Sequence, residues 1–113
     1  MNKGLIIKRQ WLNKIFNNGK HWEMRSTKTK ARGIIQLIES GSGLIVGQCM
    51  LAGCHEVTRN MAENNFESHQ VEDLELLKKW RFAWRLCNVE KYQNPIPYTH
   101  PQGAVIWVNL PAS

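Results

Sequence analysis

Short apolar runs of the kind found in β-strands recur along the whole chain, separated by turn residues. They cover residues 4–8, 33–39, 44–54, 82–92 and 104–110. The stretch Ser40-Gly41-Ser42-Gly43 joins two of these runs and is typical of a tight turn, so residues 33–54 are predicted to form a β-hairpin. Both faces of this hairpin are apolar, and we therefore expect it to be covered on two sides.

Two segments have helical spacing instead. Residues 10–18 place four apolar side chains on one stripe, namely Trp11, Leu12, Ile15 and Phe16. Gly19 follows at the position where a residue in the left-handed conformation ends many helices. Residues 57–79 are acidic and compatible with helix. Residues 94–103 contain three prolines, which excludes a strand in the centre of a sheet.

These elements predict an α+β fold, namely a small mixed β-barrel with two or three helices. The pattern alone leaves an OB-like barrel and a compact α+β sandwich open. A chain of 113 residues buries roughly two-thirds of its unfolded surface, so we expect residues 1–113 to form a single domain with its own core.

The basic charge of the chain is local. Residues 1–32 hold nine Lys or Arg and one acid, a net charge of +8, whereas residues 33–113 carry a net charge of −2. Such a localised excess favours a polyanionic partner such as nucleic acid. A solvated face that keeps the protein soluble is the alternative interpretation.

The three cysteines, Cys49, Cys54 and Cys87, are an odd number, which argues against a secreted disulfide framework. We therefore expect a cytoplasmic protein. The longest apolar stretch, residues 44–54, is too short to span a bilayer, and no membrane partner is expected. Cys49, Cys54 and His55 lack a nearby second pair of zinc ligands, so we expect neither a metal nor a cofactor.

A compact charged motif follows the first predicted helix: Gly19-Lys20-His21-Trp22-Glu23-Met24-Arg25. As a strand, it places Trp22 and Met24 on one face and Glu23 and Arg25 on the other. Lys20 lies at the turn, where we expect it to pack against little else. The following residues, 26–32, are polar and basic and are predicted to form a loop.

The spacing of glycine, lysine, glutamate and arginine in this motif resembles the hallmark of the ASCH domain family, which belongs to the PUA-like group. The order of elements and the segments 82–84 and 97–108 are similar too, so the resemblance covers nearly the whole chain. It implies a PUA-like β-barrel that binds RNA or a nucleotide in a cleft beside the motif.

Some small bacterial members of this family deacetylate N4-acetylcytidine, and a ribonuclease activity has been proposed for others. The deacetylases use a threonine nucleophile at the position of Glu23, and a glutamate cannot replace it. We also expect Glu23 to hold Lys20 in its charged form. Binding of RNA or of a modified nucleoside is therefore expected without hydrolysis of N4-acetylcytidine. A small hydrolase stays the alternative, with Lys20 and Glu23 as candidate catalytic residues.

The candidate ligand-binding residues combine cations, aromatic rings and hydrogen-bonding groups. They are Lys8, Lys20, Trp22, Glu23, Arg25, Ser26, Lys28, Tyr98 and His100. Each has a structural alternative, because exposed lysines are common and Glu23 and Arg25 could simply pair with each other. Three other tryptophans lie on apolar faces and are assigned to the core: Trp11, Trp84 and Trp107. Trp22 and then Tyr98 are the better candidates for stacking on a base.

Overall fold

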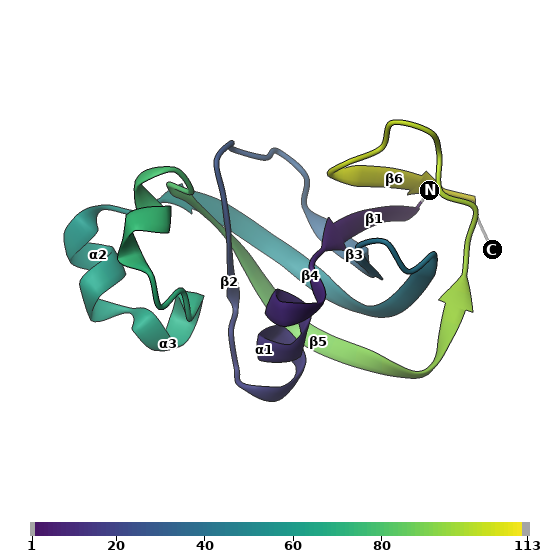
Figure 1. Cartoon of the computed structure of the whole chain (residues 1–113), viewed down its shortest axis with the longest axis horizontal. Coiled ribbons are helices and arrows are strands. Elements are labelled where there is room, and N and C mark those ends of the chain that lie inside the picture. The colour runs from purple at the N-terminus through teal and green to yellow at the C-terminus, as the bar shows by residue number, and fades with distance from the viewer. Residues whose placement is uncertain (1, 112–113) are drawn as a thin grey trace.

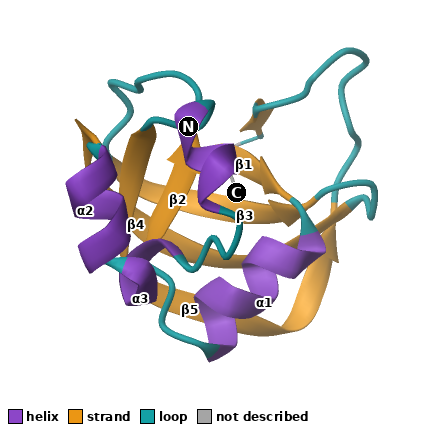
Figure 2. Cartoon of the chain, turned by 60° about the vertical axis from the view of Figure 1, so that its left-hand side comes forward, coloured by secondary structure: helices purple, strands orange, loops and turns teal. Residues whose placement is uncertain are grey.

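A computed structural model describes residues 2–111. The strands are β1 (Asn2–Ile7), β2 (Trp22–Arg25), β3 (Gly33–Glu39), β4 (Leu44–Glu56), β5 (Phe82–Pro97) and β6 (Trp107–Leu110) (Figure 1). The helices are α1 (Arg9–Asn17), α2 (Arg59–Asn64), α3 (Phe66–His69) and the short 3₁₀ helix η1 (Leu74–Lys78). The α+β class is confirmed, and Figure 2 shows the strands curling together with the helices on their outside.

The strands form one mixed sheet in the order β2-β5-β4-β3-β1-β6. Only β1 and β3 run parallel among the pairs of this sheet, with Leu5 opposite Leu37. The predicted barrel is therefore incomplete, because no ladder joins β2 to β6 within residues 2–111. Both end strands have four residues, and the barrel is left with an open seam between β2 on one side and β1 and β6 on the other.

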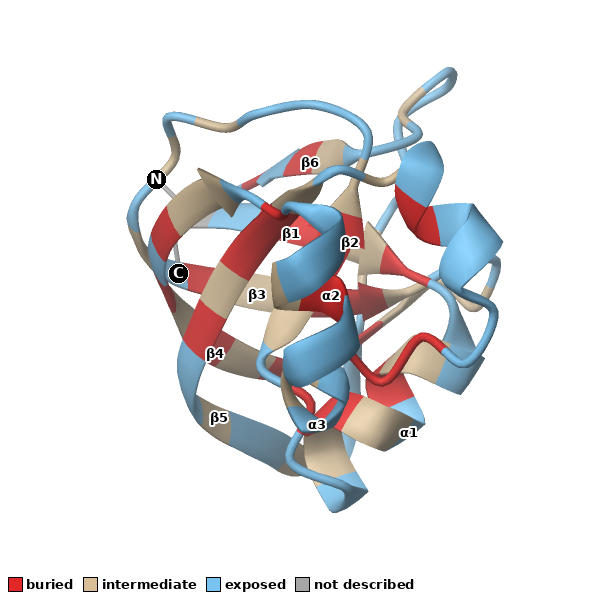
Figure 3. Cartoon of the chain, turned by 90° about the vertical axis from the view of Figure 1, so that its left-hand side faces the viewer, coloured by how far each residue is buried: buried red, intermediate tan, exposed pale blue. Residues whose placement is uncertain are grey.

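The predicted hairpin is confirmed, but the expectation that it is covered on two sides holds only in part, because Ile34 of β3 is 61% exposed and Ala52 of β4 is exposed. Buried and half-buried residues alternate along most of β4 (Figure 3). The pairing register of β3 with β4 shifts between Leu37 and Ile38, and these two neighbours belong to different buried clusters. Leu37 packs with Leu51 and the helix α1, whereas Ile38 packs with Ile45 and β6.

The predicted end of the fifth strand at residue 92 is wrong, because β5 continues to Pro97. There it pairs with β4 alone, and β2 pairs only with the first residues of β5, from Phe82 to Arg85. The prolines therefore lie on a free edge, where a missing N–H breaks no ladder hydrogen bond. The expectation that this segment is not a central strand agrees with that position.

Near β2, the helix α1 covers one face of the sheet, and the segment that contains α2, α3 and η1 covers the other. Leu12 and Ile15 of α1 pack into the largest buried cluster, against Trp84. The acidic region is helical, as predicted, but it is broken into α2, α3 and η1. It buries Ala62 and Leu77 against the other face. Within the described residues, no helix combines the length and the apolar character needed to cross a membrane.

Candidate functional site

The turn between α1 and β2 orients the first site residue. Gly19 has φ 74°, and the N–H of Lys20 donates to the carbonyl of Lys14, six residues back, at 3.1 Å. A left-handed glycine directly after the last helical residues is a common helix ending, so the predicted role of Gly19 is confirmed. The turn reverses the chain and points the Lys20 side chain inward.

Lys20 is only 2% exposed, so the expectation that it packs against little is wrong. Its Nζ donates to the carbonyl of Trp22 at 2.7 Å and to the carbonyl of His69. The ammonium lies 5.0 Å from the centre of the Trp11 ring and 3.9 Å from Oε1 of Glu23. Lys20 is therefore a buried connector between the turn, β2 and the helical region.

The pKa of Lys20 is lowered from 10.5 to about 8, chiefly by burial and to a smaller extent by the positive charges of Lys14 and Arg25. Glu23 raises this pKa but does not outweigh the loss of water around the ammonium. The expected direction of the Glu23 effect is therefore confirmed, although burial makes the net shift of this pKa a downward one. At neutral pH most molecules still carry the ammonium, because pH 7 lies below this pKa.

Glu23 lies at the centre of the charged group and is 4% exposed. Its Oε2 accepts a hydrogen bond from Nε of Arg25 at 3.1 Å, and Nη2 of Arg25 lies 2.9 Å away. The same Nη2 donates to the carbonyl of Ile6 in β1 at 2.9 Å. The side chain of Arg25 therefore bridges the open seam of the sheet. Glu23 and Arg25 pair with each other, as the structural alternative for these two residues predicted.

Two residues of the helical region complete the arrangement, and the sequence analysis missed both. His69 is fully buried, with Nδ1 accepting from the N–H of Val71 at 2.9 Å and Nε2 donating to the carbonyl of Ala62 at 2.8 Å. Burial lowers the pKa of His69, although the bond to Ala62 opposes that shift. Gln70 has φ 54° and donates to the carbonyl of Asn18 at 2.5 Å.

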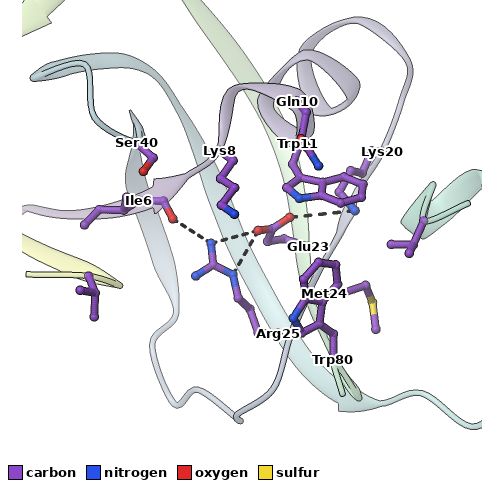
Figure 4. Close-up of a pocket in the computed structure, with 12 residues that line it drawn as sticks. Ile6, Lys8, Gln10, Trp11, Lys20, Glu23, Met24, Arg25, Ser40 and Trp80 are labelled. Carbon is purple, nitrogen blue, oxygen red and sulfur yellow. Dashed lines mark hydrogen bonds and ion pairs between the residues drawn. The ribbon is translucent and has the colours of Figure 1, made fainter. Parts of the chain in front are cut away.

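A cavity of about 260 Å³ opens at the seam, above these residues. Its polar lining includes Lys8, Lys20, Glu23 and Arg25, and Figure 4 shows Lys8 pointing towards the pair formed by Glu23 and Arg25. Three cations therefore surround one carboxylate, and the remaining lining residues are uncharged. They are Ile6, Gln10, Trp11, Met24, Ser40, Val71, Trp80 and Val105.

The aromatic wall of the cavity consists of Trp11 and Trp80, whose rings meet edge to face with centroids 5.9 Å apart. The assignment of Trp11 to the core is therefore only half right, since it is half-buried and lines the cavity. Trp107 is also half-buried, whereas Trp84 is 1% exposed and its assignment to the core is confirmed. Trp80 is a site residue that the sequence analysis missed.

The other predicted site residues lie outside this cavity. Trp22 packs on the opposite face of β2, with its ring 4.7 Å from that of His55. Lys28 and Ser26 lie in the exposed loop after β2. Tyr98 donates to Nδ1 of His100 at 2.8 Å, and Nε2 of that histidine donates to the carbonyl of Ala104 at 2.9 Å.

Both ring nitrogens of His100 thus form hydrogen bonds within the loop before β6. His100 therefore has a structural role in this loop, as the alternative interpretation expected. Of the nine candidates, the structure brings together four: Lys8, Lys20, Glu23 and Arg25. These four come from the end of β1, the helix C-cap and β2, which meet only at the seam.

Groups for covalent or metal chemistry are sparse around the cavity. Ser40 contributes the one hydroxyl side chain of its lining, and it lies on the other side of the cavity from Lys20 in Figure 4. The alternative hydroxyls Ser26, Thr27 and Thr29 do not line it. Among residues 2–111, no three His, Cys, Asp or Glu side chains are grouped to hold a metal ion. The arrangement is suited to binding an anion beside an aromatic wall.

No family model matches the sequence, and no curated protein is significantly similar to it. The structure, in contrast, is similar to the crystal structure of the ASCH protein from Zymomonas mobilis, with a TM-score of 0.71 and 12% sequence identity. The match covers 97% of this chain and 87% of that chain. The crystal structure of a point variant of the same protein is similar with the same TM-score, and this match covers 97% of this chain and 90% of the variant chain. This likeness establishes an ASCH-type fold, as the motif implied.

Proposed function

We propose that this chain binds RNA or a nucleotide, with one nucleotide unit in the cavity at the seam. The observation that carries the proposal is the lining itself, where Lys8, Lys20 and Arg25 outnumber Glu23 beside two indole rings. Cations supply attraction to phosphate, and aromatic rings supply a surface on which an unpaired base can stack.

Individual groups in the cavity have bonding capacity left for a ligand. Lys8 is exposed and has no carboxylate partner within 4.0 Å among residues 2–111. Arg25 uses Nε and Nη2 in the contacts described, which leaves Nη1 free of hydrogen bonds to the described residues. The first turn of α1 also lines the cavity, and the positive end of a helix dipole favours an anion there. We assign phosphate contact to Lys8 and Arg25.

Lys20 has a different role in this proposal from the one its motif suggested. Its ammonium already contacts two carbonyls and Glu23, and the side chain is 1% exposed. It acts as a positioning residue, which holds Glu23 and the helical region around the cavity. The base lies against Trp11 and Trp80. A volume of about 260 Å³ lies just below the roughly 300–1,000 Å³ of small-molecule sites, so the cavity has room for no more than one nucleotide unit.

Hydrolysis of N4-acetylcytidine is not part of the proposal. A hydroxyl nucleophile next to the lysine is required for that chemistry, and Ser40 lies across the cavity from Lys20. Lys20 is also mostly charged at neutral pH and is then unable to accept the proton of a nucleophile.

The affinity for single-stranded RNA is expected to fall steeply with added salt, because binding releases counterions from the phosphates. Lys8→Ala should weaken binding roughly tenfold at low salt, the effect of removing one hydrogen bond to a charged group. Fluorescence anisotropy with a labelled oligonucleotide across a salt series measures both effects. Lys79→Ala is the matched control, since Lys79 is exposed and lies in the acidic helical region. An affinity that does not change with salt, or equal losses in the two variants, would contradict the proposal.

A further inference from the structure

We infer that a single-stranded RNA leaves the cavity across a second subsite, formed by Lys3, the loop of residues 26–32 and the ring of Trp107. We call this surface the loop ridge. The inference rests on the proposed function and extends it from one nucleotide to a strand. In Figures 1 and 3 the loop between β2 and β3 lies on the same side of the molecule as β6.

A column of stacked groups connects the cavity to the loop ridge. The guanidinium of Arg25 lies 5.4 Å from the centre of the Trp84 ring. Trp84 stacks on Trp107, with centroids 5.8 Å apart and an angle of 15° between the rings. Nζ of Lys3 lies 5.5 Å from the centre of the Trp107 ring. A residue that lines the cavity is thus linked through two indoles to an exposed lysine on β1.

The loop is held against this column and presents its charges outward. Nε1 of the buried Trp84 donates to the carbonyl of Thr27 at 2.9 Å, and Ala31 packs in the same cluster as Trp107. The loop is therefore bonded to the column at Thr27 and packs against the main core at Ala31. Lys28 and Lys30, which lie between these anchors, are exposed.

The cations of the loop ridge differ from most exposed cations elsewhere on the chain. Arg9, Arg59, Lys78 and Arg81 each pair with a glutamate at 2.5–3.1 Å. Among residues 2–111, by contrast, none of the cations on the ridge has a carboxylate within 4.0 Å, namely Lys3, Lys28, Lys30 and Arg32. Unneutralised charges beside an aromatic ring are the features with which proteins hold unpaired nucleic acid.

The contact between Lys3 and Trp107 is the part that RNA would rearrange. The lysine is long and exposed, so its ammonium can move to a phosphate while a base takes its place over the indole. A duplex has no unstacked base for this exchange. The loop ridge therefore selects single strands, and it adds affinity only for ligands longer than one nucleotide.

The test compares uridine 5′-monophosphate, a ten-nucleotide single-stranded RNA and the corresponding RNA duplex. The variants are Lys3→Ala and the double variant Lys28→Ala/Lys30→Ala, with Lys79→Ala as the control and thermal melts to verify folding. We expect each ridge variant to lose about five- to tenfold in affinity for the single strand at low salt. The slope of log K against log salt should become shallower by about 0.7 for each phosphate that the variant no longer neutralises. Affinity for the mononucleotide should stay within twofold of wild type.

The outcomes separate the loop ridge from the cavity. Weaker single-strand binding in the ridge variants with an unchanged mononucleotide affinity supports the inference. If the mononucleotide fails to bind but the single strand binds through the ridge, the ridge stands and the cavity proposal fails. Equal losses for the two ligands, losses no larger than in Lys79→Ala, equal affinity for the duplex, or no binding of the single strand would each overturn the inference.

Discussion

Glu23→Ala is expected to lower the free energy of unfolding by about 3–5 kcal/mol, the typical cost of removing one partner of a buried ion pair. Glu23 is 4% exposed and lies 2.9 Å from Arg25 and 3.9 Å from Lys20, so its removal leaves two cations without their carboxylate. Chemical denaturation at pH 7 measures the change, which corresponds to roughly 10 °C or more in Tm for a domain of this size.

Glu39→Ala is the matched control, because Glu39 also pairs with an arginine, but with the exposed Arg9 at the surface. Its stability should change little, since exposed ion pairs contribute little. Arg25→Ala should resemble Glu23→Ala, and the double variant should cost clearly less than the sum of the two. If Glu23→Ala were no more destabilising than Glu39→Ala, Glu23 would not be the centre of the site.

The stability of the wild-type protein relative to Lys20→Met is expected to rise between pH 8 and about pH 10.5, by up to about 3 kcal/mol. The pKa of Lys20 is about 8 in the folded state and has its ordinary value of 10.5 when the chain is unfolded. Below pH 8 both states hold the proton, so the cost of the buried charge is constant. Between the two values only the unfolded state keeps it, and stability therefore increases with pH.

The neutral amine keeps two hydrogens, enough for the carbonyls of Trp22 and His69, so deprotonation does not break the connection between β2 and the helical region. Paired denaturation curves of the wild type and Lys20→Met at pH 7.5, 9 and 10 give the relative stability. Lys79→Met corrects for the titration of an exposed lysine. A relative stability that is constant or falls over this range would contradict the burial of Lys20 as a charged group at neutral pH.

Much of the fold could be predicted from local patterns. The strand at residues 33–39, the helix that ends before Gly19, and the hairpin turn are all determined by neighbouring residues. The open seam could not be predicted in this way, because it depends on how far β2 and β6 extend along partners distant in the sequence. The extension of β5 to Pro97 has the same origin, since a proline is acceptable only where the second neighbour is missing.

The candidate site was predicted in part, for a comparable reason. Period-two alternation placed Glu23 and Arg25 on one face, and their ion pair follows from that placement. The burial of Lys20 depends on His69, which lies 49 residues away along the chain, and no local pattern indicates that contact. The tryptophans could not be sorted by local patterns either. Trp11 and Trp22 both share a predicted face with apolar neighbours, yet of these two only Trp11 lines the cavity.

The most direct test of the cavity is an NMR titration that follows the indole N–H signals of the five tryptophans as uridine 5′-monophosphate is added. Trp11 and Trp80 should shift together and saturate with one dissociation constant, because their rings form the wall of the cavity. The indole signal of Trp22, which lies on the face of β2 opposite to Glu23, should not shift. Saturable shifts of Trp22 without Trp11 and Trp80, or no shift of any indole at millimolar nucleotide, would contradict a nucleotide site at the seam.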